Sequence, residues 1–150
     1  MVKYIIYAIF DESKNVYIGN TKQGLHRRIG KHLTDLRMYL GLTDKGSRAY
    51  RGSFDVLVSD RYKCQILDTI ETDNVKDVTE LESLYIMKYL NDDDVCCTNK
   101  CVPNINTKKR KIIDYNNLND IDFFANCEYN TNKKKCDKYH YTNFIETKDD

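Results

Sequence analysis

Two short apolar runs, separated by a polar turn, open the chain and constrain its fold more than any other feature. Residues 3–10, Lys-Tyr-Ile-Ile-Tyr-Ala-Ile-Phe, are rich in β-branched and aromatic side chains, which predicts a strand. Residues 11–15 are polar and predict a turn, and residues 16–19, Val-Tyr-Ile-Gly, predict a second short strand. The chain is therefore expected to begin as a β-hairpin with a five-residue loop.

A helix is predicted directly after this hairpin. Apolar side chains recur there at spacings of three and four residues, at Leu25, Ile29, Leu33, Leu36 and Leu40. This stripe predicts an amphipathic helix over residues 22–40, with Thr21 as its cap and Gly41 as its stop.

Further elements are predicted downstream of a basic loop over residues 41–53. Residues 54–58 and 62–70 have strand character, and residues 76–91 predict a second helix. The positions expected to be buried on this helix are Val78, Leu81, Tyr85 and Leu90.

The length and composition fit one compact domain. The chain has 150 residues, of which 41% are hydrophobic and 31% charged, and it contains a single proline. This composition excludes collagen, proline-rich linkers and polar disordered chains. We expect an α/β core of the α+β type in residues 1–100 and a Lys/Asn/Tyr-rich extension over residues 101–150, packed on the core or partly mobile. Residues 112–121 are compatible with a strand or a short helix.

The hydropathy pattern gives expectations about location. No apolar run approaches the roughly 20 residues that a membrane span needs. The first residues contain too short an apolar stretch for a secretory signal. We therefore expect a soluble intracellular protein with no membrane partner; the nucleus, the cytoplasm and the host cell of a large DNA virus all stay open.

The net charge of +1 is a cancellation between segments. Residues 1–61 carry a net charge of +5, residues 62–98 carry −6 and residues 99–150 carry +2. A basic segment followed by an acidic one suits a protein that grips a phosphate backbone and binds a divalent cation. The lysine-rich runs at 108–111 and 133–135 suit either backbone contacts to a duplex or solubility.

Six cysteines leave two interpretations open. One set has spacings that could supply a structural zinc, and it consists of Cys97, Cys101, Cys127, Cys136 and His140. Ordinary buried thiols are the alternative, because these spacings are irregular.

Four chemically active side chains are expected near one end of the hairpin. Arg28 and His32 are four residues apart, so they share one face of the first helix and could bind a phosphate. A solvated helix edge is the alternative interpretation. Tyr7 and Tyr17 lie on the two strands, where a tyrosine near an arginine can serve as a general base. Core tyrosines with a solvated tip are the alternative there.

These residues belong to an ordered set of motifs. The set runs Ile5-Ile6-Tyr7, Tyr17-Ile18-Gly19-x-Thr21, Leu25-x-x-Arg28-x-x-x-His32, Glu82-x-x-Tyr85-Ile86 and Asn99-Lys100. In this order, the motifs resemble the GIY-YIG nuclease family over about residues 3–100. Ile5 stands where the family has the first glycine of its name, a change that removes no catalytic group.

The resemblance implies a fold and an activity. The fold is a small three-stranded antiparallel sheet flanked by helices, here with a C-terminal extension. The activity is metal-dependent hydrolysis of a DNA phosphodiester, with one Mg²⁺ or Mn²⁺ ion per site. DNA is the implied partner.

The resemblance also implies roles for five residues. Tyr7 and Tyr17 match the two tyrosines of the family name, and the second is usually assigned to activate the attacking water. Arg28 matches the arginine that neutralises the scissile phosphate, and His32 matches a second base or hydrogen-bond partner. Glu82 matches the carboxylate that holds the cation, which would stabilise the leaving 3′ oxygen.

The residues predicted to contact substrate are Gly19, Arg27, Lys31 and Asn99. Gly19 matches the glycine that lets the strand pass close to the phosphate. Two positions have competitors in the sequence. Arg27 directly precedes Arg28, which is preferred because it keeps both motif spacings. Asn104 and Asn106 compete with Asn99 for the late asparagine.

Three functional hypotheses follow. The leading one is a metal-dependent endonuclease or nickase. The second is a catalytically silent nucleic-acid-binding protein that retains the fold. The third is a zinc-held interaction module in residues 101–150.

Overall fold

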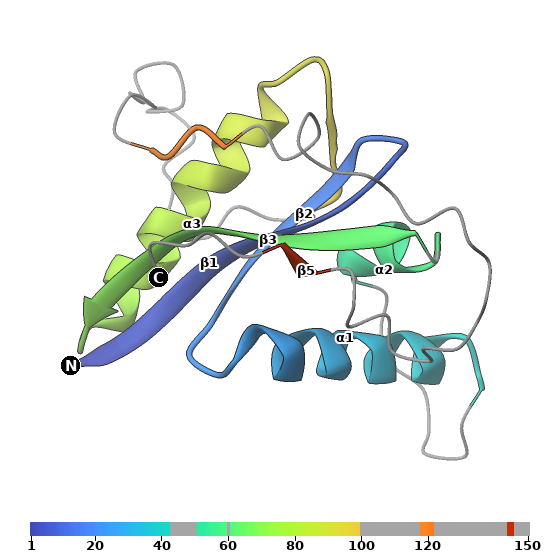
Figure 1. The fold of residues 1–150 in the computed structure, drawn as a ribbon, viewed down its shortest axis with the longest axis horizontal. Coiled ribbons are helices and arrows are strands. Elements are labelled where there is room, and N and C mark those ends of the chain that lie inside the picture. The colour runs from blue at the N-terminus through green and yellow to red at the C-terminus, as the bar shows by residue number, and fades with distance from the viewer. Residues whose placement is uncertain (43–50, 60, 100–117, 122–143, 146–150) are drawn as a thin grey trace.

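A sheet covered by helices on both faces forms the protein. The computed structural model describes residues 1–42, 51–59, 61–99, 118–121 and 144–145. In it, helix α3 (Val75–Leu90) covers one face of the sheet, and α1 (Leu25–Tyr39) and α2 (Ser53–Leu57) cover the other (Figure 1). This is the α+β arrangement that the sequence predicted. Among the described residues, no helix is long and apolar enough to cross a bilayer.

Three antiparallel strands make up the body of the sheet. The central strand β1 (Val2–Asp11) pairs with β2 (Asn15–Thr21) on one side and with β3 (Tyr62–Thr72) on the other. Two-residue strands extend the described part of the sheet in parallel at both edges, β4 (Cys96–Cys97) beside β2 and β5 (Phe144–Ile145) beside β3. The predicted antiparallel core is confirmed, and the edges add two short strands to it.

A β-bulge interrupts the pairing of β1 with β3 at the position of Tyr7. Ile6 pairs with Asp68, but Tyr7 pairs with Ile66, so Leu67 is an extra residue on β3. The bulge directs Leu67 and Asp68 towards the α3 face, while Tyr7 and Ile66 remain on the α1 face.

The turn of the hairpin is shorter than the sequence predicted. The Lys14 N–H donates to the Asp11 carbonyl at 3.1 Å, and Lys14 has a left-handed φ of 65°. The loop is therefore the three residues 12–14, closed by a left-handed residue, rather than five. The Asp11 carboxylate accepts hydrogen bonds from the backbone N–H and the side-chain amide of Asn15, both at 3.0 Å. These bonds stabilise the turn.

Helix α1 begins later than predicted and ends where predicted. The Thr21 hydroxyl accepts from the Gln23 N–H at 3.0 Å in a turn ahead of the helix, so the helix begins at Leu25 rather than at residue 22. Gly41 follows the helix with a left-handed φ of 73°, as its glycine signal predicted. Leu40 was expected to be buried but is 50% exposed, because it lies past the last helical turn.

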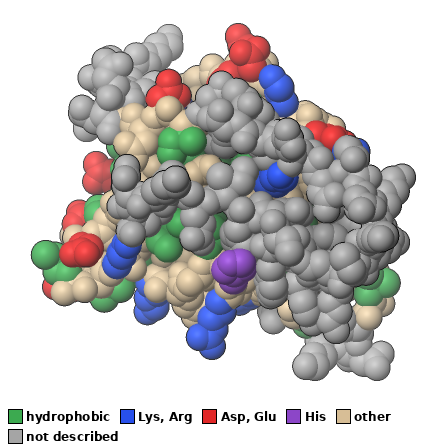
Figure 2. Space-filling view, in the orientation of Figure 1, with side chains coloured by type: hydrophobic (Ala, Val, Ile, Leu, Met, Phe, Trp, Pro, Cys, Tyr) green, Lys and Arg blue, Asp and Glu red, His purple; other side chains and the backbone are tan. Residues whose placement is uncertain are grey.

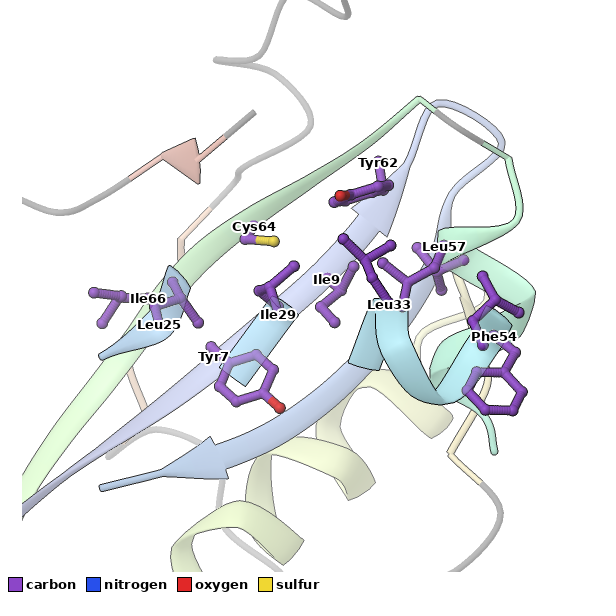
Figure 3. Close-up of a cluster of buried hydrophobic side chains, with 12 residues drawn as sticks. Tyr7, Ile9, Leu25, Ile29, Leu33, Phe54, Leu57, Tyr62, Cys64 and Ile66 are labelled. Atoms are coloured by element: carbon purple, nitrogen blue, oxygen red, sulfur yellow. The ribbon is translucent and has the colours of Figure 1, made fainter. Parts of the chain in front are cut away.

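The prediction of a strand over residues 54–58 is wrong, because these residues form helix α2. Phe54, Val56 and Leu57 pack with Ile29 and other apolar residues of α1 beneath the sheet (Figure 3). Strand propensity of such residues reflects the surface on which they pack, and here a single helical turn buries all three.

Helix α3 agrees with its prediction to within a residue at each end. The Asn74 side chain caps it by accepting from the Lys76 N–H at 3.1 Å. Val78 and Tyr85 are buried against the sheet as expected, whereas Leu90 is 43% exposed.

Part of the predicted extension packs on this helix. Leu118 is buried in the cluster beneath α3. The Asn119 backbone N–H donates to the Tyr85 hydroxyl at 2.9 Å, and its side chain donates to the Leu67 carbonyl at 2.8 Å. The division of the chain at residue 100 stays a prediction.

Several predicted features lie outside the described residues. They are both lysine-rich runs, Asn104, Asn106, and four of the five predicted zinc ligands, namely Cys101, Cys127, Cys136 and His140. The fifth, Cys97, donates its thiol hydrogen to the Asn99 side-chain oxygen at 3.4 Å. Residues 118–121, the described end of the segment over 112–121, form neither helix nor strand.

Candidate active site

The Tyr7 hydroxyl lies at the centre of the predicted site. Tyr7 is fully buried at the edge of the apolar cluster between the sheet and α1, with its hydroxyl directed towards β2 (Figure 3). This oxygen is 2.8 Å from His32 Nε2, and Arg28 Nε donates to it at 3.4 Å. The fold thus brings together three of the residues that the motifs predicted. Arg28 and His32 share one face of α1, and Tyr7 lies on β1.

His32 is held from several directions. Its Nδ1 is 3.1 Å from the Ser53 hydroxyl oxygen, and the Tyr17 ring meets it edge-on with 5.5 Å between ring centroids. Burial, together with the positive charges of Arg28 and Arg51, lowers the pKa of His32 to about 3. The imidazole is therefore neutral at physiological pH, with one N–H and one acceptor nitrogen.

The charge states of Tyr7 and Arg28 follow from their surroundings. Burial and the neighbouring Tyr17 raise the pKa of Tyr7, although Arg28 opposes this shift. Burial opposes the charge of Arg28, but Tyr7 and Tyr17 outweigh it and raise the pKa of the guanidinium. At neutral pH the site therefore contains a protonated phenol beside a fixed cation.

Gly19 leaves the space that the Tyr7 ring occupies. The two residues are opposite each other in the pairing of β1 with β2. A Cβ atom at Gly19 would be 2.4 Å from the Tyr7 hydroxyl oxygen and 2.6 Å from its Cζ. Any side chain here would displace the hydroxyl from His32, so glycine is required for the geometry of the site.

Glu82 approaches from the opposite face of the sheet. It lies on α3, and its carboxylate accepts a hydrogen bond from the Asn20 side chain on β2. Burial raises the pKa of Glu82, while the Asn20 bond and the positive charge of Arg28 oppose that rise. The charge of Arg28 thus acts on Glu82 although their helices, α1 and α3, cover different faces of the sheet.

Glu82 fits a divalent cation. Its carboxylate supplies oxygen atoms, which Mg²⁺ and Mn²⁺ prefer. Within the described residues there is no group of three or more His, Cys, Asp or Glu side chains that could hold a metal ion. A single carboxylate suits Mg²⁺, which commonly keeps several waters and binds substrate phosphates.

Asn99 lies beside the site but is engaged with the backbone. Its side-chain oxygen accepts from the Ile18 N–H at 2.9 Å, and its side-chain nitrogen donates to the Ile18 carbonyl at 2.8 Å. This amide therefore holds the middle of the Tyr17-Ile18-Gly19 motif as a neighbouring strand would. Its predicted contact with substrate stays a prediction.

The predicted substrate contacts Arg27 and Lys31 are exposed on α1. Figure 2 shows Lys and Arg side chains projecting from the lower edge of the molecule, where α1 lies in Figure 1. Neither residue is part of the buried group around Tyr7. Their place on the outer side of the helix leaves them accessible to a large ligand.

Sequence reasoning missed two residues of the site. Asn20 follows Gly19 directly, and its polar side chain at the end of a predicted strand was a usable signal. Ser53 lies in a segment predicted to be a loop, and it has no spacing relation to any motif. Its contact with His32 depends on the packing of α2, for which the sequence contained no signal.

The buried neutral state of His32 predicts a loss of stability on acidification. The folded-state pKa of about 3 is below the unfolded value of 6.5, so the native state excludes a proton that the unfolded chain binds. The contribution of His32 is fully present above pH 6.5 and declines as the pH falls towards 3. We expect the free energy of unfolding to drop by about 2 kcal/mol between pH 7 and pH 5 from this residue.

Urea unfolding at several pH values measures this effect. A His32→Gln variant should lose the pH dependence, whereas His26→Gln, on the exposed side of the same helix, should keep it. An equal pH dependence in the wild type and the His32→Gln variant would contradict the prediction.

Comparisons with known proteins identify the fold. Residues 3–93 match the sequence model of the GIY-YIG catalytic domain, which is more than half of the chain. No curated protein and no solved structure matches this chain. The matched segment covers the described elements from β1, except its first residue, to α3, and with them Tyr7, Arg28, His32 and Glu82. This chain therefore belongs to the GIY-YIG family and has its nuclease-type fold.

Proposed function

We propose that this protein is a metal-dependent endonuclease or nickase that hydrolyses phosphodiester bonds in DNA. The observation that carries the proposal is the contact of the Tyr7 hydroxyl with His32 and Arg28, together with the effect of the Arg28 charge on the Glu82 carboxylate. A cation beside a carboxylate and a proton-transfer pair is the combination that hydrolysis of a phosphodiester requires.

Arg28 binds the scissile phosphate in this proposal. Its guanidinium is charged at neutral pH and half-buried, so its attraction to a phosphate is less screened than on an open surface. Its bond to Tyr7 is long, at 3.4 Å, and can be exchanged for a phosphate oxygen. That exchange would also open a lone pair of the Tyr7 oxygen to water.

Tyr7 then takes a proton from the attacking water while it gives its own proton to His32 Nε2. The family resemblance favours Tyr17 for this role, but the 2.8 Å contact with His32 supports Tyr7, because its proton has an acceptor within reach. A concerted transfer avoids a free phenolate, which the burial of Tyr7 disfavours. Tyr17 packs against His32 in an edge-to-face contact of the two rings and helps to hold the imidazole in place.

Glu82 holds the cation in this proposal, with Asn20 beside it. When bound, the cation stabilises the negative charge that develops on the leaving 3′ oxygen. The charge of Arg28 acts on Glu82, which supports a common role for the two residues at one phosphate. Arg27 and Lys31 contact the flanking backbone, and Gly19 and Asn99 line the approach to the site.

A cleavage assay tests the proposal. Supercoiled, branched and single-stranded DNA are incubated with the wild type in Mg²⁺, in Mn²⁺ and in chelator. We expect nicked product only with a metal ion. Metal-independent binding with no product on long incubation would instead indicate a silent nucleic-acid-binding protein.

Substitution of each of the two neighbouring arginines should distinguish a catalytic role from a role in binding in this assay. Arg28→Ala should lower kcat about a hundredfold, since loss of one group that stabilises transition-state charge typically has an effect of this size. Arg27→Ala, on the exposed side of the helix, should raise KM and weaken binding with kcat nearly unchanged. A larger loss of kcat in Arg27→Ala would show that the catalytic arginine is misassigned by one residue.

A further inference from the structure

Ser53 is a buried residue that contacts the proposed proton-transfer pair from outside the family motifs. It is the first residue of α2, its exposed fraction is 0%, and its hydroxyl oxygen is 3.1 Å from His32 Nδ1. His32 Nε2 contacts Tyr7 on the other side of the ring. A continuous row of polar contacts thus runs from Arg28 through Tyr7 and His32 to Ser53.

The backbone fixes the position of the Ser53 hydroxyl. The carbonyl of the preceding Gly52 accepts from the Thr98 hydroxyl at 2.7 Å, and the Thr98 N–H donates to the Val16 carbonyl of β2 at 2.8 Å. A Cβ atom at Gly52 would be 2.2 Å from the Thr98 carbonyl oxygen, so the two segments touch. The start of α2 is therefore tied to β2, the strand that contains Tyr17.

One arrangement of hydrogens along this row lets the Tyr7 hydroxyl donate to His32. Arg28 can only donate, so the Tyr7 oxygen accepts from it. The Tyr7 O–H can then donate to His32 Nε2, which leaves the single hydrogen of the neutral ring on Nδ1. In this arrangement the Ser53 oxygen, 3.1 Å from Nδ1, accepts that hydrogen.

We propose that Ser53 is a positioning residue that holds neutral His32 in the tautomer with its hydrogen on Nδ1, so that Nε2 can accept the Tyr7 proton. This inference rests on the proposed function and adds a residue to it. In the opposite tautomer, His32 Nε2–H would donate to the Tyr7 oxygen. Both His32 and Arg28 would then occupy that oxygen, and the ring could not accept the proton.

Removal of the Ser53 hydroxyl should remove the constraint on the tautomer of His32. In Ser53→Ala the Nδ1–H tautomer loses its buried acceptor, so the preference for this tautomer disappears and both forms are populated. The protonated ring formed during proton transfer also loses the bond that spreads its charge. Because loss of such an outer partner typically costs 10–100-fold, we expect kcat to fall about tenfold with KM unchanged.

Nitrogen NMR of the full chain with ¹⁵N-labelled histidine tests the inference without relying on activity. A two-bond ¹H–¹⁵N correlation distinguishes the tautomers, and a His32→Gln spectrum assigns the signal among the three histidines. We expect the Nδ1–H form in the wild type, a mixture in Ser53→Ala and recovery in Ser53→Thr. Ser59→Ala, which removes a hydroxyl that bonds to Val56 and Arg61 at the end of α2, should match the wild type.

The outcomes separate the two proposals. An Nε2–H tautomer in the wild type, or an unchanged tautomer in Ser53→Ala, would overturn the role of Ser53. The expected tautomers in a wild type that cleaves no DNA would support that role and would contradict the nuclease proposal.

Discussion

Glu82→Gln is expected to lower metal-dependent cleavage about a thousandfold, since charge stabilisation by a bound metal ion contributes several kcal/mol to a hydrolytic transition state. Glutamine has nearly the same shape and can still bond to Asn20, so the substitution removes little except the charge. Without that charge a divalent cation loses its only predicted protein carboxylate, and Arg28 loses a neighbouring anion. The fold should be unaffected, because Glu82 is not part of either apolar cluster.

Plasmid nicking at several Mn²⁺ concentrations measures this effect, and the loss of the free Mn²⁺ signal in electron paramagnetic resonance measures binding. Glu80→Gln is the matched control, because Glu80 is exposed on another side of α3. Glu82→Gln should reduce both cleavage and Mn²⁺ binding, whereas Glu80→Gln should change neither. Wild-type cleavage by Glu82→Gln would remove this residue from the site.

Gly52→Ala is expected to cost about 3 kcal/mol of folding free energy, at the upper end of overpacking penalties. The backbone of Gly52 has helical angles (φ −58°, ψ −31°), so alanine meets no conformational strain. The cost comes from contact, since the new Cβ would be 2.2 Å from the Thr98 carbonyl oxygen and 3.3 Å from Asn99 Cα. Both neighbours are backbone atoms and cannot rotate away.

Urea unfolding measures the loss, and a thermal scan should show a melting temperature lower by about 10 °C. Gly24→Ala is the control, because a Cβ at Gly24 meets nothing within 4 Å. Because Gly24 caps α1, its replacement by alanine should lower the free energy of unfolding by no more than about 1 kcal/mol. Equal losses in the two variants would show that the contact between α2 and residue 98 is not tight.

Most of the fold could be predicted because its elements have strong local patterns. The hairpin, α1, β3 and α3 each bury a regularly spaced apolar set, and each keeps its predicted type. Helix α2 was predicted wrongly because its five residues are too few for a helical period, and the alternating apolar residues at 54–58 indicated a strand. Only their packing against α1 decides their conformation.

The contacts of the candidate site likewise fall into those that local spacing predicts and those that depend on the fold. Arg28 and His32 share a helix turn, so their common face follows from spacing alone. The contact between Tyr7 and His32 spans 25 positions, and it could be predicted only through the resemblance to a family. The contact of Ser53 with His32 spans 21 positions and belongs to no motif. Nothing in the local sequence distinguished this serine from an ordinary loop residue.

Local patterns in the sequence were sufficient for the hairpin, α1, β3 and α3, for the basic and acidic halves of the core and for the set of candidate site residues. These properties depend on residue type and short-range spacing, which the chain contains before it folds. The packing of the helices on the sheet was needed to show that the charge of Arg28 acts on Glu82, although the two residues lie on helices that cover opposite faces. It also decided that His32 is neutral, because burial and neighbouring cations, rather than residue type, set its pKa.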